Sequence, residues 1–208
     1  MTDVPAVRRL DPDRRSEAIA AVSRAFWPDP LFGFFARDEV QEHRVLPLFL
    51  GALLRDCLAH GEVWSTVDHG RITGAASWLP PSALPRSRLR EARIYAACAR
   101  ALVTCRNRRT GIRLLDAVER AHPAEPHWYL ALLGVDPSRQ RRGLGGRLLE
   151  PVLERCDREV ENAYLETQKP ENLPFYERFG FVVIGEVRVD DSPTIWRMWR
   201  EPDPSRSR

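Results

Sequence analysis

The sequence predicts an α/β (α+β) domain in which helices flank a twisted, mixed β-sheet. Three observations predict this fold class. An apolar run at 128–135 leads through a Gly/Arg-rich turn into an amphipathic helix, and a second apolar strand follows at 163–167. Residues 62–79 have the pattern of a β-hairpin, and 38–58 has apolar residues at helical spacing. Strand, helix and strand in this order favour a parallel pair, to which the hairpin adds antiparallel strands.

Length, composition and charge restrict the class of protein. With 208 residues, 43% of them hydrophobic, the chain predicts a single domain over 1–200 and a flexible polar tail at 201–208. Its apolar runs are too short to span a bilayer, and 1–8 has no apolar signal region, so we expect a cytoplasmic protein with no membrane partner. A net charge of only +3 argues against nucleic acid as a partner.

The cysteines are Cys57, Cys98, Cys105 and Cys156, and they form no Cys-x-x-Cys or Cys/His spacing. Widely separated cysteines of this kind are typical of reduced structural thiols rather than of a metal centre. We therefore expect no metal site.

The N-terminal region predicts a short strand at 6–10 and a helix at 14–26. Residues 11–13, Asp-Pro-Asp, supply capping groups for that helix, and the prolines within 27–30 end it. Its inward face is expected to carry Ile19, Ala20, Val22 and Phe26.

A longer amphipathic helix is expected at 38–58, ended by Gly61. Pro47 lies inside this pattern, so the sequence predicts either a kink or two helices. The hairpin strands are expected at 62–67 and 71–79, joined by Asp-His-Gly.

Residues 80–122 separate the hairpin from the next strand. They contain two patterns of helical spacing, at 86–105 and 107–121. The arginine run at 106–109 is interpreted as a solvated turn between the two helices.

The turn after the strand at 128–135 mixes arginines with glycines, and the helix behind it is expected at 143–157, bent at Pro151. The first turn of a helix has N–H groups without intrahelical partners and the positive end of the macrodipole, so such a turn suits phosphate. A dinucleotide fingerprint is excluded because Leu148 occupies its third glycine position, and a Walker loop is excluded because no Gly-Lys-Ser/Thr follows.

The C-terminal part predicts four elements. They are a parallel strand at 163–167, a short helix at 172–179, and strands at 181–190 and 194–200.

Two separated motifs give the chain a family resemblance. The first, Val135-x-Pro137-x-x-Gln140-x-x-Gly143-x-Gly145, resembles the acetyl-CoA signature of the GNAT acyltransferases. The second, an Asn followed by Tyr-x-x-x-Gly-Phe within 172–181, resembles another signature of that family. Within the family the resemblance is closest to the puromycin N-acetyltransferases. It is carried by Glu125-Pro126-x-Trp128, Leu165-Glu166-Thr167, Asn172 through Arg178, and Trp196.

The resemblance implies the GNAT fold, whose central parallel strands splay apart at their C-terminal ends, here with a helical insertion at 80–122 between the third and fourth strands. It also implies acetyl-CoA as co-substrate, held by the Gly/Arg turn, by the splayed strand edge and by Asn172, which would bond the pantetheine arm. Asn172 is also expected to cap the short helix, and capping alone is the alternative role for it. The expected cofactor-binding residues are Leu133, Gly134, Val135, Gln140, Arg141, Arg142, Gly143, Leu144, Gly145, Gly146 and Asn172.

The implied reaction moves an acetyl group directly from the thioester to an amine. An alkyl ammonium has a pKa of about 10 and must lose a proton before it attacks. The candidate bases are Glu166, Glu125, His127 and Asp29, or water between them, with a satisfied structural histidine as the simpler interpretation of His127. Glu166 is taken as a catalytic residue on this basis.

The departing thiolate needs a proton, and Tyr176 is the expected general acid. A phenol is protonated at neutral pH and can donate to a thiolate. Packing between Phe175 and Phe179 is the alternative role for this tyrosine.

The acceptor is expected to be a primary amine of a small molecule. Aromatic residues around the break at 27–30 either pack two helices together or line its pocket, and the candidate pocket residues are Phe26, Trp27, Asp29 and Phe32. An aminonucleoside such as puromycin is one candidate and would imply antibiotic resistance. Another small amine, a peptide or protein amine, and a non-catalytic acyl-CoA-binding domain are the alternatives. The insertion at 80–122 either selects the substrate or is a packing or dimer element, and a monomer and a homodimer both stay open.

Overall fold

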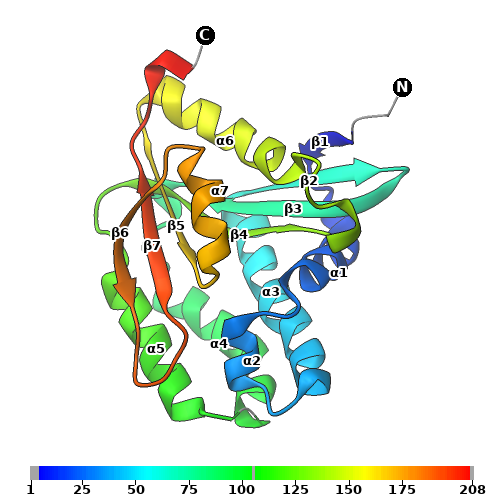
Figure 1. Cartoon of the computed structure of the whole chain (residues 1–208), viewed down its shortest axis with the longest axis vertical. Helices are drawn as coiled ribbons and strands as arrows, with labels where there is room; N and C mark the ends of the chain where they lie inside the picture. Colours follow the sequence, from blue (N-terminus) through cyan, green and yellow to red (C-terminus); the bar gives the residue numbers. More distant parts are fainter. Residues whose placement is uncertain (1–4, 105, 207–208) are drawn as a thin grey trace.

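The computed structural model describes residues 5–104 and 106–206, and within them the chain forms one mixed sheet with helices on both faces (Figure 1). The strand order is β1-β2-β3-β4-β5-β7-β6. The strands are β1 (Ala6–Arg9), β2 (Glu62–Asp68), β3 (Arg71–Leu79), β4 (His127–Val135), β5 (Asn162–Thr167), β6 (Val182–Val187) and β7 (Ile195–Arg200). The predicted fold class is confirmed.

The centre of the sheet is a parallel pair that separates part of the way along. Strands β4 and β5 pair only from His127 with Asn162 to Leu130 with Leu165. Beyond Leu130, β4 continues to pair with β3 on its other side, up to Val135. The remaining neighbouring strands are antiparallel. The described part of the sheet therefore has an unpaired β4 edge where the two strands diverge.

A bulge in β4 lies at this point of divergence. Ser77 pairs with Leu132 and Trp78 pairs with Leu130, so Ala131 is an extra residue on β4. Leu130 consequently packs in the core on one face of the sheet and Leu132 in the core on the other. The bulge turns β4 away from β5 and helps to open the space between them.

Two hydrophobic cores cover the faces of the sheet. One contains the apolar face of α6 (Leu144–Glu159), and α7 (Leu173–Glu177) lies on the same side. The other contains α1 (Arg15–Phe26) and α3 (Glu39–His60), with the short α2 (Pro30–Phe35) between them in sequence. Figure 1 shows α6 across one end of the sheet and α4 and α5 near the other.

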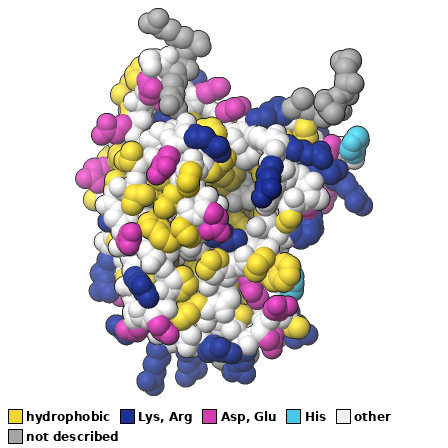
Figure 2. All heavy atoms as spheres, in the orientation of Figure 1, with side chains coloured by type: hydrophobic (Ala, Val, Ile, Leu, Met, Phe, Trp, Pro, Cys, Tyr) yellow, Lys and Arg dark blue, Asp and Glu magenta, His cyan; other side chains and the backbone are white. Residues whose placement is uncertain are grey.

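The insertion forms helices α4 (Arg88–Thr104) and α5 (Arg108–Ala121), as its spacing predicts. Arg86 and Arg90 both bond to Asp56 and so attach the start of α4 to α3. Leu114 attaches α5 to the far side of the sheet through Val187 and Ile195. The arginines at 106–109 are exposed, and Figure 2 shows Lys and Arg side chains gathered at the lower edge of the molecule.

One prediction about the first helix is wrong: Ala20 is exposed, and α1 instead buries Ala18, Ala21 and Val22. Of the two alternatives for Pro47, a division into two helices is excluded because α3 runs unbroken from Glu39 to His60, and a kink stays a prediction. The predicted end at Gly61 is confirmed, since its N–H donates to the carbonyl of Cys57.

Residues 201–206, placed in the predicted tail, lie against the domain. The Asp203 N–H donates to Asp157 at 2.7 Å, and Pro204–Arg206 form a short 3-10 helix beside α6. This part of the predicted tail therefore contacts the domain, and its flexibility stays a prediction.

Cys57 and Cys156 are buried free thiols, and burial raises the pKa of each to about 12. The Cys98 side chain and Cys105 lie outside the described residues. None of the described helices combines the length and apolarity that a membrane span requires.

Candidate active site

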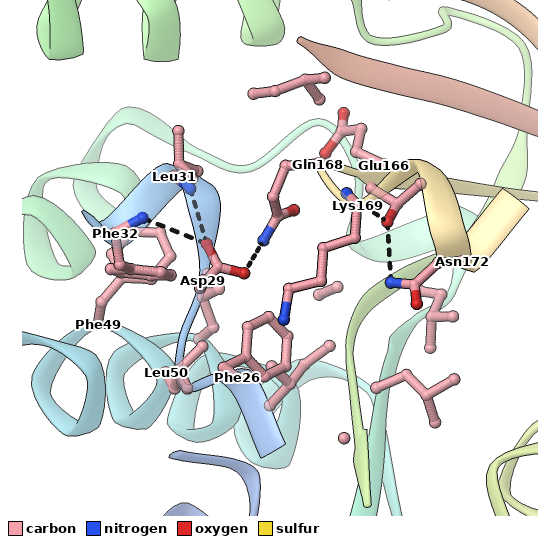
Figure 3. Close-up of a pocket in the computed structure, with 18 of the residues that line it drawn as sticks. Phe26, Asp29, Leu31, Phe32, Phe49, Leu50, Glu166, Gln168, Lys169 and Asn172 are labelled. Carbon is pink, nitrogen blue, oxygen red and sulfur yellow. Dashed lines mark hydrogen bonds between the residues drawn. The ribbon is translucent and has the colours of Figure 1, made fainter. Parts of the chain in front are cut away.

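The divergence of β4 and β5 opens into a cavity of about 520 Å³. One side is lined by the unpaired edge of β4, the start of α6 and the α7 segment. The other side is lined by the α1–α2 turn, by α3 and by the insertion helices. Figure 3 shows residues from the α1–α2 turn and from the end of β5 facing each other across this space. The cavity therefore joins the predicted cofactor side to the predicted acceptor side.

The unpaired edge of β4 supplies Leu133, Gly134 and Val135 to the cavity. Gly134 is needed for close packing on α1, because a Cβ there would lie 3.0 Å from the Ala25 Cβ. The Gln140 amide donates to the carbonyl of Val135 at 3.0 Å and fixes the turn that follows the strand.

The start of α6 has the geometry of an anion-binding turn. Arg141 and Gly143 have positive φ angles of 60° and 75°. Among the described residues, the N–H groups of Leu144, Gly145 and Gly146 have no acceptor. Such N–H groups, at the positive end of a 16-residue helix, favour a negatively charged ligand.

The predicted cofactor residues divide into two groups. Leu133, Gly134, Val135, Gln140, Gly145 and Asn172 line the cavity. Arg141, Arg142 and Gly143 are exposed outside it, the Leu144 side chain is in the core, and a Cβ on Gly146 would meet the Phe179 ring at 2.6 Å. The second group forms the turn at the mouth of the cavity rather than its wall.

Asn172 does not cap the helix that follows it, contrary to the prediction. Its φ and ψ angles are already helical, and its side chain makes no capping bond. Its amide instead donates to the Thr167 hydroxyl at 3.2 Å (Figure 3). The residue thereby attaches the α7 segment to the end of β5 and lines the cavity between them.

Tyr176 lines the same cavity and is only 7% exposed. Burial raises the pKa of its phenol well above the ordinary value, so the hydroxyl stays protonated at neutral pH. Its ring also packs against Phe175 and Phe181. The position suits both a proton donor and a packing residue.

Glu166 lines the cavity at the point where β5 separates from β4. It accepts hydrogen bonds from the hydroxyls of Tyr129 and Tyr164, each at 2.8 Å, and lies 3.5 Å from His122 Nδ1. Burial raises the pKa of Glu166, but the contacts with His122 and the two tyrosines lower it by more, so the pKa lies below the ordinary value. Glu166 is therefore ionised at neutral pH.

His127 is buried beside this group and does not line the cavity. Its Nδ1 lies 2.7 Å from the carbonyl oxygen of Glu125, and its Nε2 lies 3.1 Å from Nε2 of His122. Burial lowers the pKa of His127. His127 is thus the satisfied histidine that the sequence favours, and the Glu125 side chain is exposed outside the cavity.

His122 is the residue that the sequence motifs missed. It ends α5, lines the cavity, and contacts both Glu166 and His127. Its only signal in the sequence is its spacing of five positions from His127, and that spacing matches no motif considered above.

Some aromatic residues near the α1–α2 turn line the cavity, and Trp27 packs against a neighbouring helix. Phe26 and Phe32 line the cavity, with Leu31 beside them (Figure 3). Trp27 does not line it; its ring stacks on His43 at 4.5 Å and joins the turn to α3. Trp27 is thus a packing residue, contrary to its assignment to the pocket.

Asp29 lines the cavity but its carboxylate is occupied. Oδ1 accepts from the N–H groups of Leu31 and Phe32, and Oδ2 accepts from Gln168 at 2.6 Å (Figure 3). Burial raises the pKa of Asp29 although these bonds oppose it. Asp29 therefore holds the α1–α2 turn against the end of β5.

The insertion closes the acceptor side of the cavity. It contributes Arg86, Glu91, Ile94, Tyr95, Leu115, Val118, Glu119 and His122. Within the described residues, no group of three or more His, Cys, Asp or Glu side chains is arranged to hold a metal ion.

A profile of the acetyltransferase (GNAT) domain family matches residues 117–201. An uncharacterized N-acetyltransferase of Schizosaccharomyces pombe is 44% identical over 79 residues, which cover 36% of this chain and 32% of that protein. The chain thus matches about a third of the length of that relative.

Solved structures extend the likeness to almost the whole chain. A histone acetyltransferase HPA2 and related acetyltransferase from Corynebacterium glutamicum has a TM-score of 0.67 and 23% identity, over 95% of this chain and 96% of that one. The Drosophila melanogaster polyamine N-acetyltransferase, which forms N-acetylagmatine, has a TM-score of 0.61 and 20% identity, over 95% and 100%. Identities this low show the fold alone: the chain shares the fold of these acetyltransferases over almost its whole length, and the match to the acetyltransferase (GNAT) domain profile is confined to residues 117–201.

Proposed function

We propose that the chain is an N-acetyltransferase that moves an acetyl group from acetyl-CoA to a primary amine of a small molecule. One observation carries the proposal: a single cavity connects the unpaired β4 edge and the α6 turn to Glu166 and Tyr176. An acyl thioester entering from one side and an amine entering from the other would meet at the divergence of β4 and β5.

The residues present fit an acyl-CoA. The β4 edge at 133–135 has backbone groups that are not paired with β5. The pantetheine arm can bond to them in the way that a neighbouring strand would. The N–H groups of 144–146, with Arg141 and Arg142 exposed nearby, suit the pyrophosphate. Acetyl-CoA supplies the activated acyl group, and the chain supplies binding, orientation and proton transfer.

The chemistry proposed for Tyr176 is donation to the departing sulfur. A buried phenol with a raised pKa keeps its proton until a thiolate develops beside it. A thiol has a pKa of about 8.5, below that of the phenol. Proton transfer from the phenol to the sulfur therefore becomes favourable only in a site that is pre-organised around the leaving group.

The acceptor side favours a small amine that carries an apolar or aromatic part. Phe26, Phe32, Phe49 and Tyr95 line it, and carboxylates at Glu91 and Glu119 can attract a cation. An aminonucleoside such as puromycin, to which the sequence motifs point, and a polyamine or agmatine, named for a structural neighbour, are both of this class. The cover formed by the insertion favours these over a protein amine.

The test is release of CoA thiol from acetyl-CoA, measured with the purified protein. Puromycin, agmatine, spermidine and an arylalkylamine would each be compared with a reaction lacking amine. Amine-dependent release supports the proposal and identifies the acceptor class. Tight acetyl-CoA binding with no release for any amine would instead favour a non-catalytic acyl-CoA-binding domain.

A further inference from the structure

Lys169 is the only lysine in the 208 residues, and it lines the cavity. It stands two residues beyond the end of β5, and Asn172 and Tyr176 of the same segment line the same space. Figure 3 shows its side chain extending across the cavity toward Phe26. The cavity proposed for a primary amine therefore already contains one.

A single hydrogen bond holds the Lys169 ammonium among the described residues. Nζ donates to the carbonyl oxygen of Pro28 in the α1–α2 turn at 2.9 Å. The neighbouring Asp29 carboxylate is already occupied, because Gln168 and two backbone N–H groups donate to it. A lysine head group sits on a flexible four-carbon stem, so rotation about that stem releases Nζ from Pro28 and moves it within the cavity.

The acyl thioester of the proposed reaction would lie beside the same segment. Asn172 donates to Thr167 at 3.2 Å and so holds the segment that carries Lys169 and Tyr176 against the end of β5. Under the proposed function Tyr176 faces the departing sulfur, so the thioester and Nζ share one cavity of about 520 Å³. Two groups held in one site react far faster than the same groups in free solution.

We propose that Lys169 is a self-acetylation site: in the absence of a competing amine, its Nζ takes the acetyl group of acetyl-CoA bound in the same cavity. This inference rests on the proposed acetyltransferase function and deepens it, since the chain's own side chain belongs to the proposed class of acceptor. Acetylation replaces the ammonium at the cavity wall by a neutral amide, so it changes the site that the amine substrate enters.

The sequence leaves few other groups that could take the acetyl group as an amine. The remaining permanent cations are arginines, whose guanidinium stays protonated in proteins and does not attack a thioester. An N-terminal α-amine, with an ordinary pKa of about 7.7–8.0, is the amine that simple chemical acetylation attacks first. Acetylation of Lys169 ahead of the α-amine is therefore the mark of a reaction within the cavity.

The step consumes one ammonium and one thioester and gives an amide, a thiol and one proton. Nζ of Lys169 first loses a proton to water and then attacks the acetyl carbonyl. The N–C bond forms and the C–S bond breaks. Tyr176 gives its proton to the sulfur and regains one from the nitrogen as the amide forms.

Mass spectrometry of the intact protein and of its peptides tests the proposal. The purified protein is incubated with acetyl-CoA and no amine, and modification is followed at each amine of the chain. We expect one acetyl group at Lys169, in the protein as purified or after incubation, and none at position 169 in Lys169→Arg. A Lys169 side chain that stays unmodified overturns the proposal.

A lysine placed outside the cavity gives the matched control and leaves Lys169 intact. Arg158 near the end of α6 is suitable, because its side chain is 61% exposed and does not line the cavity. In Arg158→Lys we expect position 169 to be acetylated faster than position 158 by about 10²-fold or more, because only position 169 shares a site with the thioester. Equal rates, or a faster reaction at position 158, would mean ordinary chemical acetylation and would overturn the proposal.

Competition with a substrate amine locates the reaction. With acetyl-CoA in excess, a saturating concentration of any amine in the panel above that releases CoA should slow acetylation of Lys169 by about 10-fold or more, because the two nitrogens compete for one site. An unchanged rate would place the reaction outside the acceptor side of the cavity and contradict the proposal.

This inference and the proposed function fail separately. Amine-dependent release of CoA with no acetyl group on Lys169 would leave the proposed function standing and overturn the inference. Acetylation of Lys169 with no release for any amine would support the inference and remove the small amine from the proposed function.

Discussion

Arg200 at the end of β7 and Asp157 near the end of α6 form a buried ion pair. Arg200 Nη2 lies 2.6 and 2.7 Å from the two carboxylate oxygens, and the residues are only 2% and 4% exposed. Arg200 Nε also donates to the carbonyl of Phe179, at the end of the α7 segment. One guanidinium thus joins the last strand, the central helix and the segment that carries Tyr176.

Removing the carboxylate of this pair should destabilise the fold strongly. We expect Asp157→Ala to lower the free energy of unfolding by about 3–5 kcal/mol, because the buried guanidinium loses its counter-charge. Urea denaturation measures the change. Arg113→Ala is the matched control, since its ion pair with Asp190 is exposed and should contribute less than about 1 kcal/mol. Equal effects of the two substitutions on the unfolding free energy would contradict a larger contribution from the buried pair.

Close packing of α6 on the α7 segment gives a second prediction. A Cβ on Gly146 would lie 2.6 Å from Phe179 Cζ, so Gly146→Ala forces the ring or the helix to move. We expect a loss of about 1–3 kcal/mol in unfolding free energy, as overpacking typically costs. Gly33→Ala in α2 is the control, because its Cβ would meet only Glu42 Oε2 at 3.7 Å. That control should be neutral or stabilising. If Gly146→Ala leaves the unfolding free energy unchanged, the Phe179 ring or the helix can move without cost.

His127 gives a prediction about pH. Burial, and the neighbouring His122, lower its pKa in the fold, so protonation of His127 favours the unfolded chain. Its contribution to stability is therefore complete above about pH 6.5, the unfolded value, and is lost as the pH falls toward the lower folded value. The difference in unfolding free energy between wild type and His127→Gln should shrink between about pH 7.5 and 5 in denaturation curves. A difference that grows on acidification would mean that the fold prefers the charged ring.

The fold could be predicted because its signals are local. The hairpin, the strand before the Gly/Arg turn and the two insertion helices each follow from periodicity and turn residues within about 20 positions. Periodicity fixes the face of a helix only to within about one residue, which is why Ala20 was assigned inward while Ala18 and Ala21 are buried. The bulge at Ala131 has no local signal, although it sets where β4 and β5 separate.

For a similar reason, the residues that line the β4 and α6 side of the cavity could be predicted more fully than those that line the opposite side. The motif residues from Leu133 to Gly145 lie on one strand and one turn, so their neighbours are known from sequence. His122, Glu166 and Asp29 come from three separate segments, and only the tertiary fold brings them to one cavity. Trp27 stacks on His43 of another helix, and Asn172 donates to Thr167 five positions earlier; neither contact follows from a spacing rule.

The role of Tyr176 gives the most direct prediction about turnover. Tyr176→Phe removes only the hydroxyl, and among the described residues that hydroxyl has no hydrogen-bond partner, so acetyl-CoA affinity and stability should change little. We expect kcat to fall by about 10²-fold or more because the thiolate then leaves without a proton. Calorimetric titration of acetyl-CoA and steady-state kinetics measure the two effects separately.

The leaving group provides the control for that prediction. An acetyl thioester of a more acidic thiol depends less on proton donation, so Tyr176→Phe should slow it less than acetyl-CoA. Because burial raises the pKa of the phenol, the wild type should also show no loss of rate from ionisation of Tyr176 below about pH 10, the ordinary phenol value. An unchanged kcat in Tyr176→Phe would leave packing against Phe175 and Phe181 as the function of this residue, and the sulfur would then take its proton from water in the cavity.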